Sequence, residues 1–287
     1  MKVAIVGASG AVGQEFLRVL EERNFPIDEL LLFGSSRSAG RKYTFRGKEI
    51  EVKLLQHNDD FKGVDIAFTS AGGGTSKEFA ETITKHGAVM IDNSSAFRMD
   101  PDVPLIVPEI NGDDAKNHNG IISNPNCSTI ITLVAVNGIN QLSKITSMVA
   151  STYQAVSGAG AAGPVELEQQ TRALAEGKPV ECKTFPYQIA ANLIPQIGGF
   201  NDDGYTTEEM KMQNEGRKIF HLPELLVSCT CVRVPVVRSH SIMATVRTEK
   251  KLTVDQVKQA IAAAPGCVLV DDPAEKRYPM PLETSDQ

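Results

Sequence analysis

Residues 2–13 read KVAIVGASGAVG, a short apolar run followed by glycines at every third position. The run at 3–6 is typical of a buried strand, and apolar residues then recur at helical spacing over 12–20. The glycines therefore lie in a strand-to-helix turn, where they let the backbone approach a pyrophosphate held by the amides of the helix start. The stretch predicts a dinucleotide-binding, Rossmann-like domain. A tight turn without a ligand is the alternative, because GASGAVG (7–13) departs from the stricter G-x-G-x-x-G spacing.

The alternation of strand and helix continues along the first half of the chain. Apolar runs at 29–33 and 64–70 end at Gly34 and in the glycine cluster 72–74, a polar helical stretch covers 75–86, and further strand candidates lie at 88–92 and 103–107. This rhythm predicts right-handed crossovers and a parallel sheet.

The pattern changes just after Cys127, where we place the boundary between two domains. Strands are expected at 145–156, 226–235 and 242–247, and helices at 164–177, 208–220 and 254–264. We expect these strands to form a mostly antiparallel sheet. The fold class is α/β for the first domain, joined to an α+β second domain.

Length and charge exclude several classes of protein. A chain of 287 residues suggests about two domains. The net charge of −6 gives no electrostatic case for nucleic acid or an anionic membrane. No apolar stretch approaches the ~20 residues of a membrane span. Five cysteines without a C-x-x-C pair predict no metal site and free thiols, as in the cytoplasm.

The end of the second predicted strand bears on the choice of cofactor. It runs into Gly34-Ser35-Ser36-Arg37-Ser38, with no acidic residue to hold a ribose 2′-hydroxyl. Hydroxyls and an arginine are what a 2′-phosphate needs, so the stretch predicts NADP. The alternative is that Arg37 is a solvated surface charge.

Cys127 is the candidate nucleophile. It follows Asn126, a plausible helix N-cap, so the thiol lies in the first turn of the next helix. The helix N-terminus is expected to lower the pKa of this thiol and raise its reactivity. A small buried side chain is the alternative, and it is the reading that we favour for Cys229 and Cys231.

Taken together, several segments make the chain resemble the aspartate-β-semialdehyde dehydrogenase family. They are GASGAVG (7–13), SSRSAG (35–40), DNSSAFR (92–98), NPNCST (124–129), STYQAVSGAG (151–160), EEMKM (208–212) and CVRVPVVRSHS (231–241). N-acetyl-γ-glutamyl-phosphate reductase, a related family, carries Gly-Cys-Tyr-Pro around its cysteine, from which Asn126-Cys127-Ser128 departs.

The resemblance implies a role for each matching residue. Cys127 is the nucleophile that becomes a thioester, His240 the acid/base, and Gln154 the group that orients the acyl chain. Arg98 and Lys211 hold phosphate, while Arg233 binds the substrate carboxylate and Glu208 its amino group. NADP contacts are implied for Gly7, Ser9, Gly10, Ala11, Val12, Ser35, Arg37, Ser38, Ser157 and Gly158.

The implied reaction suits these residue types. A thiolate adduct of an aldehyde is a good hydride donor, and a histidine can take the hydroxyl proton of that adduct at neutral pH. For single residues, an interpretation without a catalytic or binding role stays open. His240 could lie in a surface turn. Glu208 and Lys211 could be a plain surface pair worth ~0.2–0.5 kcal/mol.

The resemblance also implies how the whole protein is built and used. It implies an NADP-binding domain at 1–127, a catalytic and dimerisation domain at 128–287, and a homodimer. The substrates would be aspartate semialdehyde and phosphate, in the pathway to lysine, threonine, methionine and isoleucine. The family's C-terminal return segment is expected to be absent.

Three other functions remain as alternatives. One is a related acyl-phosphate reductase such as N-acetyl-γ-glutamyl-phosphate reductase. Another is a cysteine hydrolase or acyltransferase using Cys127 and His240, which leaves the glycine loop unexplained. The third is an inactive, truncated nucleotide-binding form.

Overall fold

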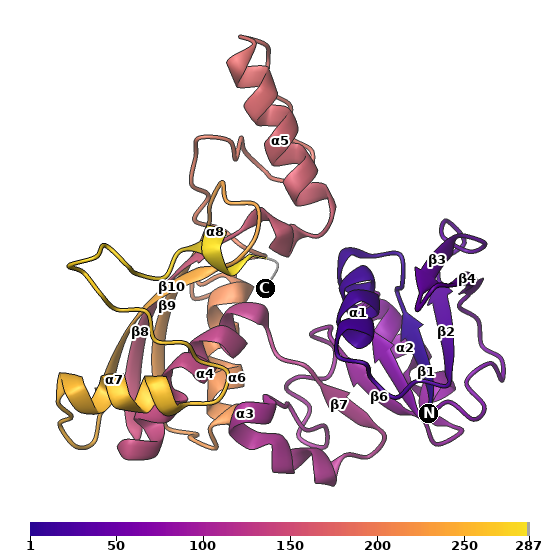
Figure 1. Ribbon diagram of the computed structural model, residues 1–287, viewed down its shortest axis with the longest axis horizontal. Coiled ribbons are helices and arrows are strands. Elements are labelled where there is room, and N and C mark those ends of the chain that lie inside the picture. The colour runs from indigo at the N-terminus through magenta and orange to yellow at the C-terminus, as the bar shows by residue number, and fades with distance from the viewer. Residues whose placement is uncertain (286–287) are drawn as a thin grey trace. The chain divides into compact units, whose positions relative to one another are not determined.

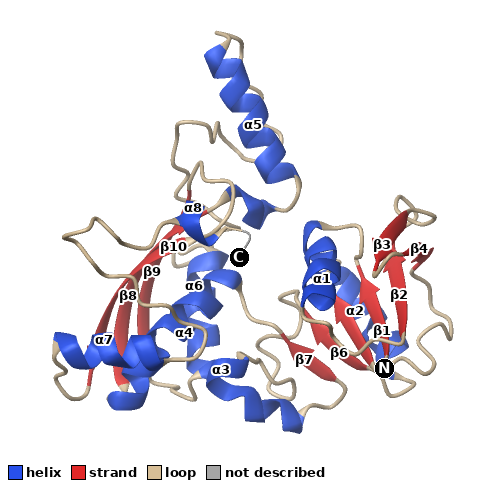
Figure 2. Cartoon of the chain, viewed as in Figure 1, coloured by secondary structure: helices blue, strands red, loops and turns tan. Residues whose placement is uncertain are grey.

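The structure is a computed structural model that describes residues 1–285. The chain forms two compact units, Met1–Pro125 and a second that begins at Asn126. Figure 1 traces the chain through both units, and Figure 2 shows the same view by secondary structure.

The first unit is built on a seven-stranded sheet in the order β3-β4-β2-β1-β5-β6-β7. The strands are β1 (Lys2–Val6), β2 (Glu29–Gly34), β3 (Lys42–Phe45), β4 (Lys48–Leu54), β5 (Ile66–Thr69), β6 (Val89–Asp92) and β7 (Ile121–Ser123). All neighbours are parallel except β3 and β4. The predicted Rossmann-like sheet is thereby confirmed, with β1 at its centre because Val3–Val6 are buried on both faces.

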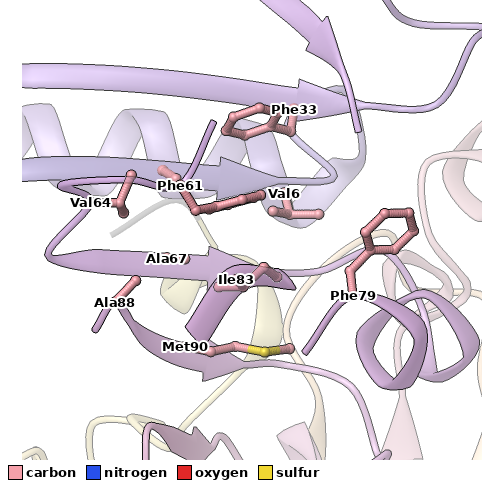
Figure 3. Packing of buried hydrophobic residues seen from close by; sticks show 10 residues of the cluster. Val6, Phe33, Phe61, Val64, Ala67, Phe79, Ile83, Ala88 and Met90 are labelled. Atoms are coloured by element: carbon pink, nitrogen blue, oxygen red, sulfur yellow. The ribbon is translucent and has the colours of Figure 1, made fainter. Parts of the chain in front are cut away.

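Four helical segments accompany this sheet: α1 (Ala11–Glu22), α2 (Gly73–Thr84), α3 (Pro108–Asn111) and the 3₁₀ turn η1 (Gly112–Asn117). One core cluster, drawn in Figure 3, joins Phe33 of β2 to Phe79 and Ile83 of α2. The rings of Phe33 and Phe61 stack at 4.7 Å between centroids. Burying such side chains is worth about 1.5–3 kcal/mol each, which holds the strand ends in place.

The expectation of a strand over 103–107 is wrong. Only Leu105 makes an isolated bridge, to Ser123, and the sheet position is taken by β7 instead. Pro104 has no amide to donate. The side chain of Asn111 bonds the N–H of Val107 and the C=O of Leu105, which occupies groups that a ladder would need.

The hairpin of β3 and β4 was not expected from the sequence. Its loop is the two residues Arg46 and Gly47, both with positive φ (48° and 73°). Two-residue loops with positive φ match the twist of paired strands. The signal is weak in the sequence because Arg-Gly is an unusual pair for this turn.

The second unit holds a three-stranded sheet and several helices. The strands are β8 (Ile145–Gln154), β9 (Leu226–Arg233) and β10 (Ser241–Thr248). The helical segments are α4 (Cys127–Leu142), η2 (Val156–Ala159), α5 (Ala162–Ala175), α6 (Thr207–Ile219), α7 (Val254–Ala263) and α8 (Pro281–Thr284). Helices α4 and α6 lie against the sheet, and α7 packs on α4 (Figures 1 and 2).

The sheet of the second unit is mixed, which corrects the expected mostly antiparallel arrangement. Its order is β10-β8-β9, with β10 antiparallel and β9 parallel to β8. The chain between β8 and β9 includes α5 and α6, and this length permits the crossover that a parallel pair needs. Alternating residues of β8 are buried, among them Thr152 and Gln154, whereas Val149 and Tyr153 are exposed.

No helix among residues 1–285 has the length and apolar character needed to cross a bilayer.

We expect Gly13→Ala to lower the free energy of unfolding by about 1–3 kcal/mol, the cost of forcing atoms into a packed site. A Cβ at Gly13 would lie 2.3 Å from the carbonyl oxygen of Gly7 and 2.7 Å from Ala8 Cα, both backbone atoms. Urea unfolding of the full chain measures this change.

Gly74→Ala is the matched control, because a Cβ there meets nothing within 4 Å. It should be neutral or stabilising, by up to about 1 kcal/mol, since alanine favours the helix. Equal effects at the two positions would contradict the tight packing at Gly13.

Candidate active site

The polar residues of the second unit converge where β8 and β9 end and β10 begins. Strands β8 and β9 are parallel, so Gln154 and Arg233 lie side by side at their carboxyl ends. Because β10 runs the other way, Ser241 pairs with Tyr153 and His240 lies at the same edge. The topology thus gathers residues that are far apart in sequence.

The start of α4 presents Cys127 at this edge. Asn126 caps the helix: its Oδ1 accepts hydrogen bonds from the amides of Ser128 and Thr129 at 3.0 and 3.2 Å. The expected N-cap is confirmed. Cys127 is accordingly the first helical residue, and it is exposed to solvent on one side while its sulfur faces His240 within the site.

Cys127 Sγ lies 3.3 Å from Nε2 of His240, so the structure brings together the two residues for which the resemblance implies the roles of nucleophile and acid/base. The preceding Ser239 has a φ of 68°, a left-handed conformation that is unusual for a side chain with a Cβ. Such strain persists where surrounding contacts hold it. Ser239 Oγ lies 3.1 Å from Ser285 Oγ, which is one such contact.

The electrostatics of this pair differ from the expectation. Removal of water from around the sulfur, followed by the negative charge of Glu208, raises the pKa of the Cys127 thiol. The amide of Ser128 and the charge of Arg233 act in the lowering direction but are outweighed. Burial and then Arg233 lower the pKa of His240 to about 4, so its ring is neutral at pH 7.

Glu208 forms the centre of a buried polar cluster, not a plain surface pair. Its Oε1 accepts from Asn126 Nδ2 at 2.9 Å and from Gln154 Nε2 at 3.1 Å, and its Oε2 accepts from Lys211 Nζ at 2.8 Å. Burial would raise the pKa of Glu208, but Lys211 and the two amides lower it on balance. The carboxylate is therefore ionised, in keeping with an ammonium-binding role.

Gln154 and Lys211 are both engaged with Glu208 in this structure. Gln154 is buried, and its Oε1 accepts from Thr152 Oγ1 at 3.0 Å. Both ends of the Gln154 amide are thus held, which fixes its orientation at the site. Lys211 keeps part of its side chain exposed, with 29% of its surface accessible.

Arg233 is buried. A buried charge among apolar strand residues needs a hydrogen-bond partner. Arg233 Nη1 donates to the carbonyl oxygen of Ala155 at 2.7 Å. A Cβ on Gly158 would lie 2.8 Å from the same Nη1 and 3.3 Å from His240 Cε1. A side chain at 158 would therefore require the Arg233 guanidinium to shift and the His240 ring to give slightly.

Arg98 lies in the first unit, where it is buried in loops. Its Nε donates to the carbonyl oxygen of Asn124 and its Nη2 to that of Asn93, each at 2.9 Å. These loops follow β7 and β6, so Arg98 ties the two strand ends together.

Most of the predicted cofactor residues of the first unit line one cavity of about 600 Å³. Gly7, Ser9, Gly10, Ser35, Arg37 and Ser38 line it, whereas Ala11 and Val12, at the start of α1, do not. Ser157 and Gly158 lie on η2 in the second unit. The remaining lining residues are Val6, Gly34, Arg41, Leu55, Ser70, Ala71, Thr75 and Phe79.

The glycine loop has the features of a phosphate-binding turn. Gly7 has a φ of +86°, and a Cβ there would lie 2.3 Å from the carbonyl oxygen of Ser70. The hydroxyl of Ser9 is buried with no hydrogen-bond partner among the described residues. A buried hydroxyl without a partner is costly unless a ligand supplies one. The residues present therefore fit a dinucleotide phosphate.

Sequence reasoning missed some residues of both sites. Arg41, in the connection between β2 and β3, and Thr75, on α2, line the cavity. Neither residue belongs to a recognisable sequence motif. Ala155 contributes only backbone groups, which no residue pattern reveals. The contact of Asn126 with Glu208 spans 82 positions and depends on the fold.

Within residues 1–285, no three His, Cys, Asp or Glu side chains gather closely enough to hold a metal ion.

Comparisons with known proteins find a family match for each of the two units. The family profile described as "Semialdehyde dehydrogenase, NAD binding domain" matches residues 2–118. The profile described as "Semialdehyde dehydrogenase, dimerisation domain" matches residues 136–287.

Individual proteins that are similar to this chain carry the same family name. The chain is 53% identical to the aspartate-semialdehyde dehydrogenase of Aquifex aeolicus over 284 residues, covering 98% of this chain and 84% of the relative. For the enzyme of that name from Bacillus subtilis the identity is 48%, with 99% and 84% covered. The crystal structure of aspartate semialdehyde dehydrogenase II from Vibrio cholerae, complexed with ASA, has a TM-score of 0.90 and 47% identity, covering 92% of this chain and 79% of that one.

We expect Glu208→Gln to lower the pKa of the Cys127 thiol, because the substitution removes the negative charge that disfavours the thiolate. The thiolate fraction at neutral pH then rises, and with it the rate of alkylation. The measurement is the rate of iodoacetamide labelling of Cys127 against pH, followed by mass spectrometry.

Glu168→Gln, on α5 and paired with Arg172, is the matched control. It should leave the labelling profile unchanged. If Glu208→Gln left the labelling profile unchanged, or shifted it to higher pH, the Glu208 charge would not be what raises the pKa of the Cys127 thiol.

Proposed function

The chain belongs to the aspartate-semialdehyde dehydrogenase family, and we propose that it interconverts aspartate 4-semialdehyde, phosphate and NADP with 4-phospho-aspartate and NADPH through a thioester on Cys127. The observation that carries this proposal is the separation of 3.3 Å between Cys127 Sγ and His240 Nε2. The nucleophile stands beside an imidazole, an arginine and a carboxylate of one unit.

Covalent chemistry explains why the thiol is needed. A free aldehyde is a poor hydride donor, whereas its adduct with the Cys127 thiolate carries an oxygen that can drive the hydride out. Bound at the glycine loop, NADP supplies the hydride acceptor. Loss of hydride leaves a thioester, which phosphate attacks to give the acyl phosphate and release the thiolate. His240 is the proposed acid/base, which takes the hydroxyl proton of the adduct as the hydride leaves; its Nε2 lies 3.3 Å from Sγ, beside which that hydroxyl forms.

Two buried side chains of opposite charge suit an amino-acid substrate. Arg233 can meet the substrate carboxylate with two parallel N–H bonds, and Glu208 can accept from its ammonium. Gln154, held between Thr152 and Glu208, orients the acyl chain. The Vibrio cholerae homologue is described as complexed with ASA, which supports the same substrate here.

Phosphate is the second substrate, and Arg98 and Lys211 are its proposed ligands. Lys211 pairs with Glu208 in this structure and retains an exposed portion that an anion can reach. When a substrate ammonium takes its place on Glu208, the Lys211 charge becomes available to phosphate. Cations hold an attacking anion in line, which is the main requirement of this step.

NADP is the proposed dinucleotide, with a preference over NAD. Ser35, Arg37 and Ser38 line the cavity beside the end of β2, and Arg41 adds a second positive charge to its wall. Of the residues lining this cavity, none is acidic. Contacts from Ala11, Val12, Ser157 and Gly158 are also proposed, on the resemblance alone.

Several features of the whole protein follow from the family. The dimerisation-domain match makes a homodimer the expected assembly. We propose a functional division into an NADP-binding domain at 1–127 and a catalytic domain from 128. We also propose a cytoplasmic location, in keeping with five free cysteines, and a role in the pathway to lysine, threonine, methionine and isoleucine.

Phosphate-dependent reduction of NADP by aspartate semialdehyde, followed by NADPH absorbance, tests the proposed function. N-acetylglutamate semialdehyde should react at least two orders of magnitude less efficiently in kcat/KM, because it leaves Glu208 buried and unpaired. Turnover that needs neither NADP nor phosphate would instead support a hydrolase or acyltransferase.

We expect Cys127→Ser to abolish this reaction while NADP binding is retained. A serine hydroxyl has a far higher pKa than a thiol and cannot form the adduct at neutral pH. Cys182→Ser, at another exposed cysteine, is the control and should keep full activity. Near-normal turnover of Cys127→Ser would overturn the thioester route.

We expect Arg37→Ala to raise the Michaelis constant for NADP and to leave that for NAD almost unchanged, since only NADP carries the 2′-phosphate. Steady-state kinetics with both cofactors measure the two constants. Arg172→Ala, on α5 in the second unit, controls for a general loss of positive charge. An equal loss for both cofactors would mean that Arg37 has a structural role.

A further inference from the structure

Asp92, the last residue of β6, is fully buried, and both oxygens of its carboxylate accept hydrogen bonds. Oδ1 accepts from Thr69 Oγ1 at 2.8 Å, from Ser76 Oγ at 2.6 Å and from the Ser94 N–H at 3.3 Å. Oδ2 accepts from Ser94 Oγ at 2.6 Å. A buried carboxylate is costly unless donors surround it, so these residues are what stabilise an acidic side chain at this position.

The donors come from three separate segments of the first unit. Thr69 ends β5 and lies opposite Asp92 in the parallel pair of β5 and β6. Ser76 completes the first turn of α2, and Ser94 lies in the loop after β6. The helix start and the loop lie close together, since a Cβ at Gly73 would be 3.9 Å from Ser94 Oγ. One carboxylate therefore fixes how a strand end, a helix start and a loop meet.

The loop after β6 leads from Asp92 to Arg98, a proposed ligand of phosphate. Ser94 Oγ donates to Asp92 and also accepts from the Ala96 N–H at 3.1 Å, which closes a short turn. The C=O of Asn93 accepts from Arg98 Nη2 at 2.9 Å. The position of the Arg98 guanidinium thus depends on the backbone path of this loop, and Asp92 holds that path.

The helix side leads from Asp92 to the wall of the cavity at the glycine loop. The connection between β5 and α2 and the first turn of α2 supply Ser70 and Thr75 to that wall. The residues on either side, Thr69 and Ser76, both donate to Asp92. Asp92 itself is not among the residues that line the cavity, so it acts on the wall only through these two hydroxyls.

We propose that Asp92 is a positioning residue that sets the Arg98 guanidinium for phosphate and the cavity wall for the dinucleotide. The proposal rests on the function given above and adds to it a residue that touches neither ligand. A carboxylate facing these sites would repel both anions. Here hydroxyl and amide donors cover both of its oxygens, so its charge orders the surrounding segments without being presented to a ligand.

Two substitutions that each remove one hydroxyl separate the two sides of Asp92. Ser94→Ala should raise the KM for phosphate about tenfold, a factor typical of losing one hydrogen bond to a charged group, and leave the KM for NADP unchanged. Ser76→Ala should raise the KM for NADP by about the same factor and leave that for phosphate unchanged. Steady-state kinetics with each substrate varied in turn measure these constants.

Asp92→Asn should affect both sides, because an amide keeps only one acceptor oxygen and turns its NH₂ group toward a donor. We expect the KM values for phosphate and NADP to rise together, while that for aspartate semialdehyde stays unchanged, since Arg233 and Glu208 lie in the second unit. Asp65→Asn is the matched control: Asp65 is exposed and accepts from the Lys2 N–H at 2.7 Å. It should leave all three constants unchanged.

A purely structural role for Asp92 gives a different result. It would raise all three KM values alike, or lower kcat alone, and either outcome would overturn the proposal. The same holds if Ser94→Ala and Ser76→Ala shift the same constant, because the two sides would then not be distinct.

Amide hydrogen exchange of the intact protein, followed by NMR, tests the loop independently of activity. The N–H groups of Ser94 and Ala96 are bonded through this network and should exchange slowly in the wild type. Asp92→Asn should speed their exchange at least about tenfold, whereas Asp65→Asn should not. Unchanged exchange in Asp92→Asn would show that the carboxylate does not hold the loop.

The outcomes separate this proposal from the proposed function. If wild-type protein fails to reduce NADP with aspartate semialdehyde and phosphate, the function is wrong, and dissociation constants of NADP and phosphate from calorimetry on the same variants take the place of the KM values. If wild-type protein is active but the variants change all three KM values alike, only the role of Asp92 is overturned.

Discussion

The buried carboxylate of Glu208 is the constraint on which the arrangement of the active site depends. A buried charge is tolerated only when it is paired and hydrogen-bonded. Glu208 meets this demand with Asn126 at the start of α4, Gln154 at the end of β8 and Lys211 one turn further along α6. Satisfying one charge therefore aligns two helices and a strand, and it places the cap of α4 beside the proposed substrate-binding residues.

The same constraint acts on the proposed nucleophile, Cys127. Asn126 serves two purposes, since its Oδ1 caps α4 and its Nδ2 bonds Glu208. Cys127 consequently sits at the helix start, where amides favour a thiolate, but within reach of a carboxylate that disfavours it. The pKa of the thiol is raised on balance. A substrate ammonium that neutralises Glu208 would remove part of this penalty at the moment when a thiolate is required.

The fold could be predicted from the sequence where local pattern and tertiary structure agree. The glycine turn, α1, α2, α6 and the strands β1, β5, β6 and β8 lie where periodicity placed them. The pattern failed at 103–107, where Asn111 takes backbone groups that an apolar run alone does not reveal. It also failed to identify the direction of β9, because alternation of buried residues is the same in parallel and antiparallel pairs.

The sequence by itself determined the chemistry that is available: a cysteine behind a helix cap, a glycine turn after a buried strand, and hydroxyls with an arginine where NAD-binding proteins carry an acid. Local composition and spacing are sufficient for these features, since each lies within a few consecutive residues. Only the tertiary structure decided how the groups act. The separation of 113 positions between Cys127 and His240 closes to 3.3 Å because β10 is antiparallel to β8. The hydrogen bonds of the His240 ring and the burial of Glu208 then follow from backbone groups and neighbours that meet only in the folded chain.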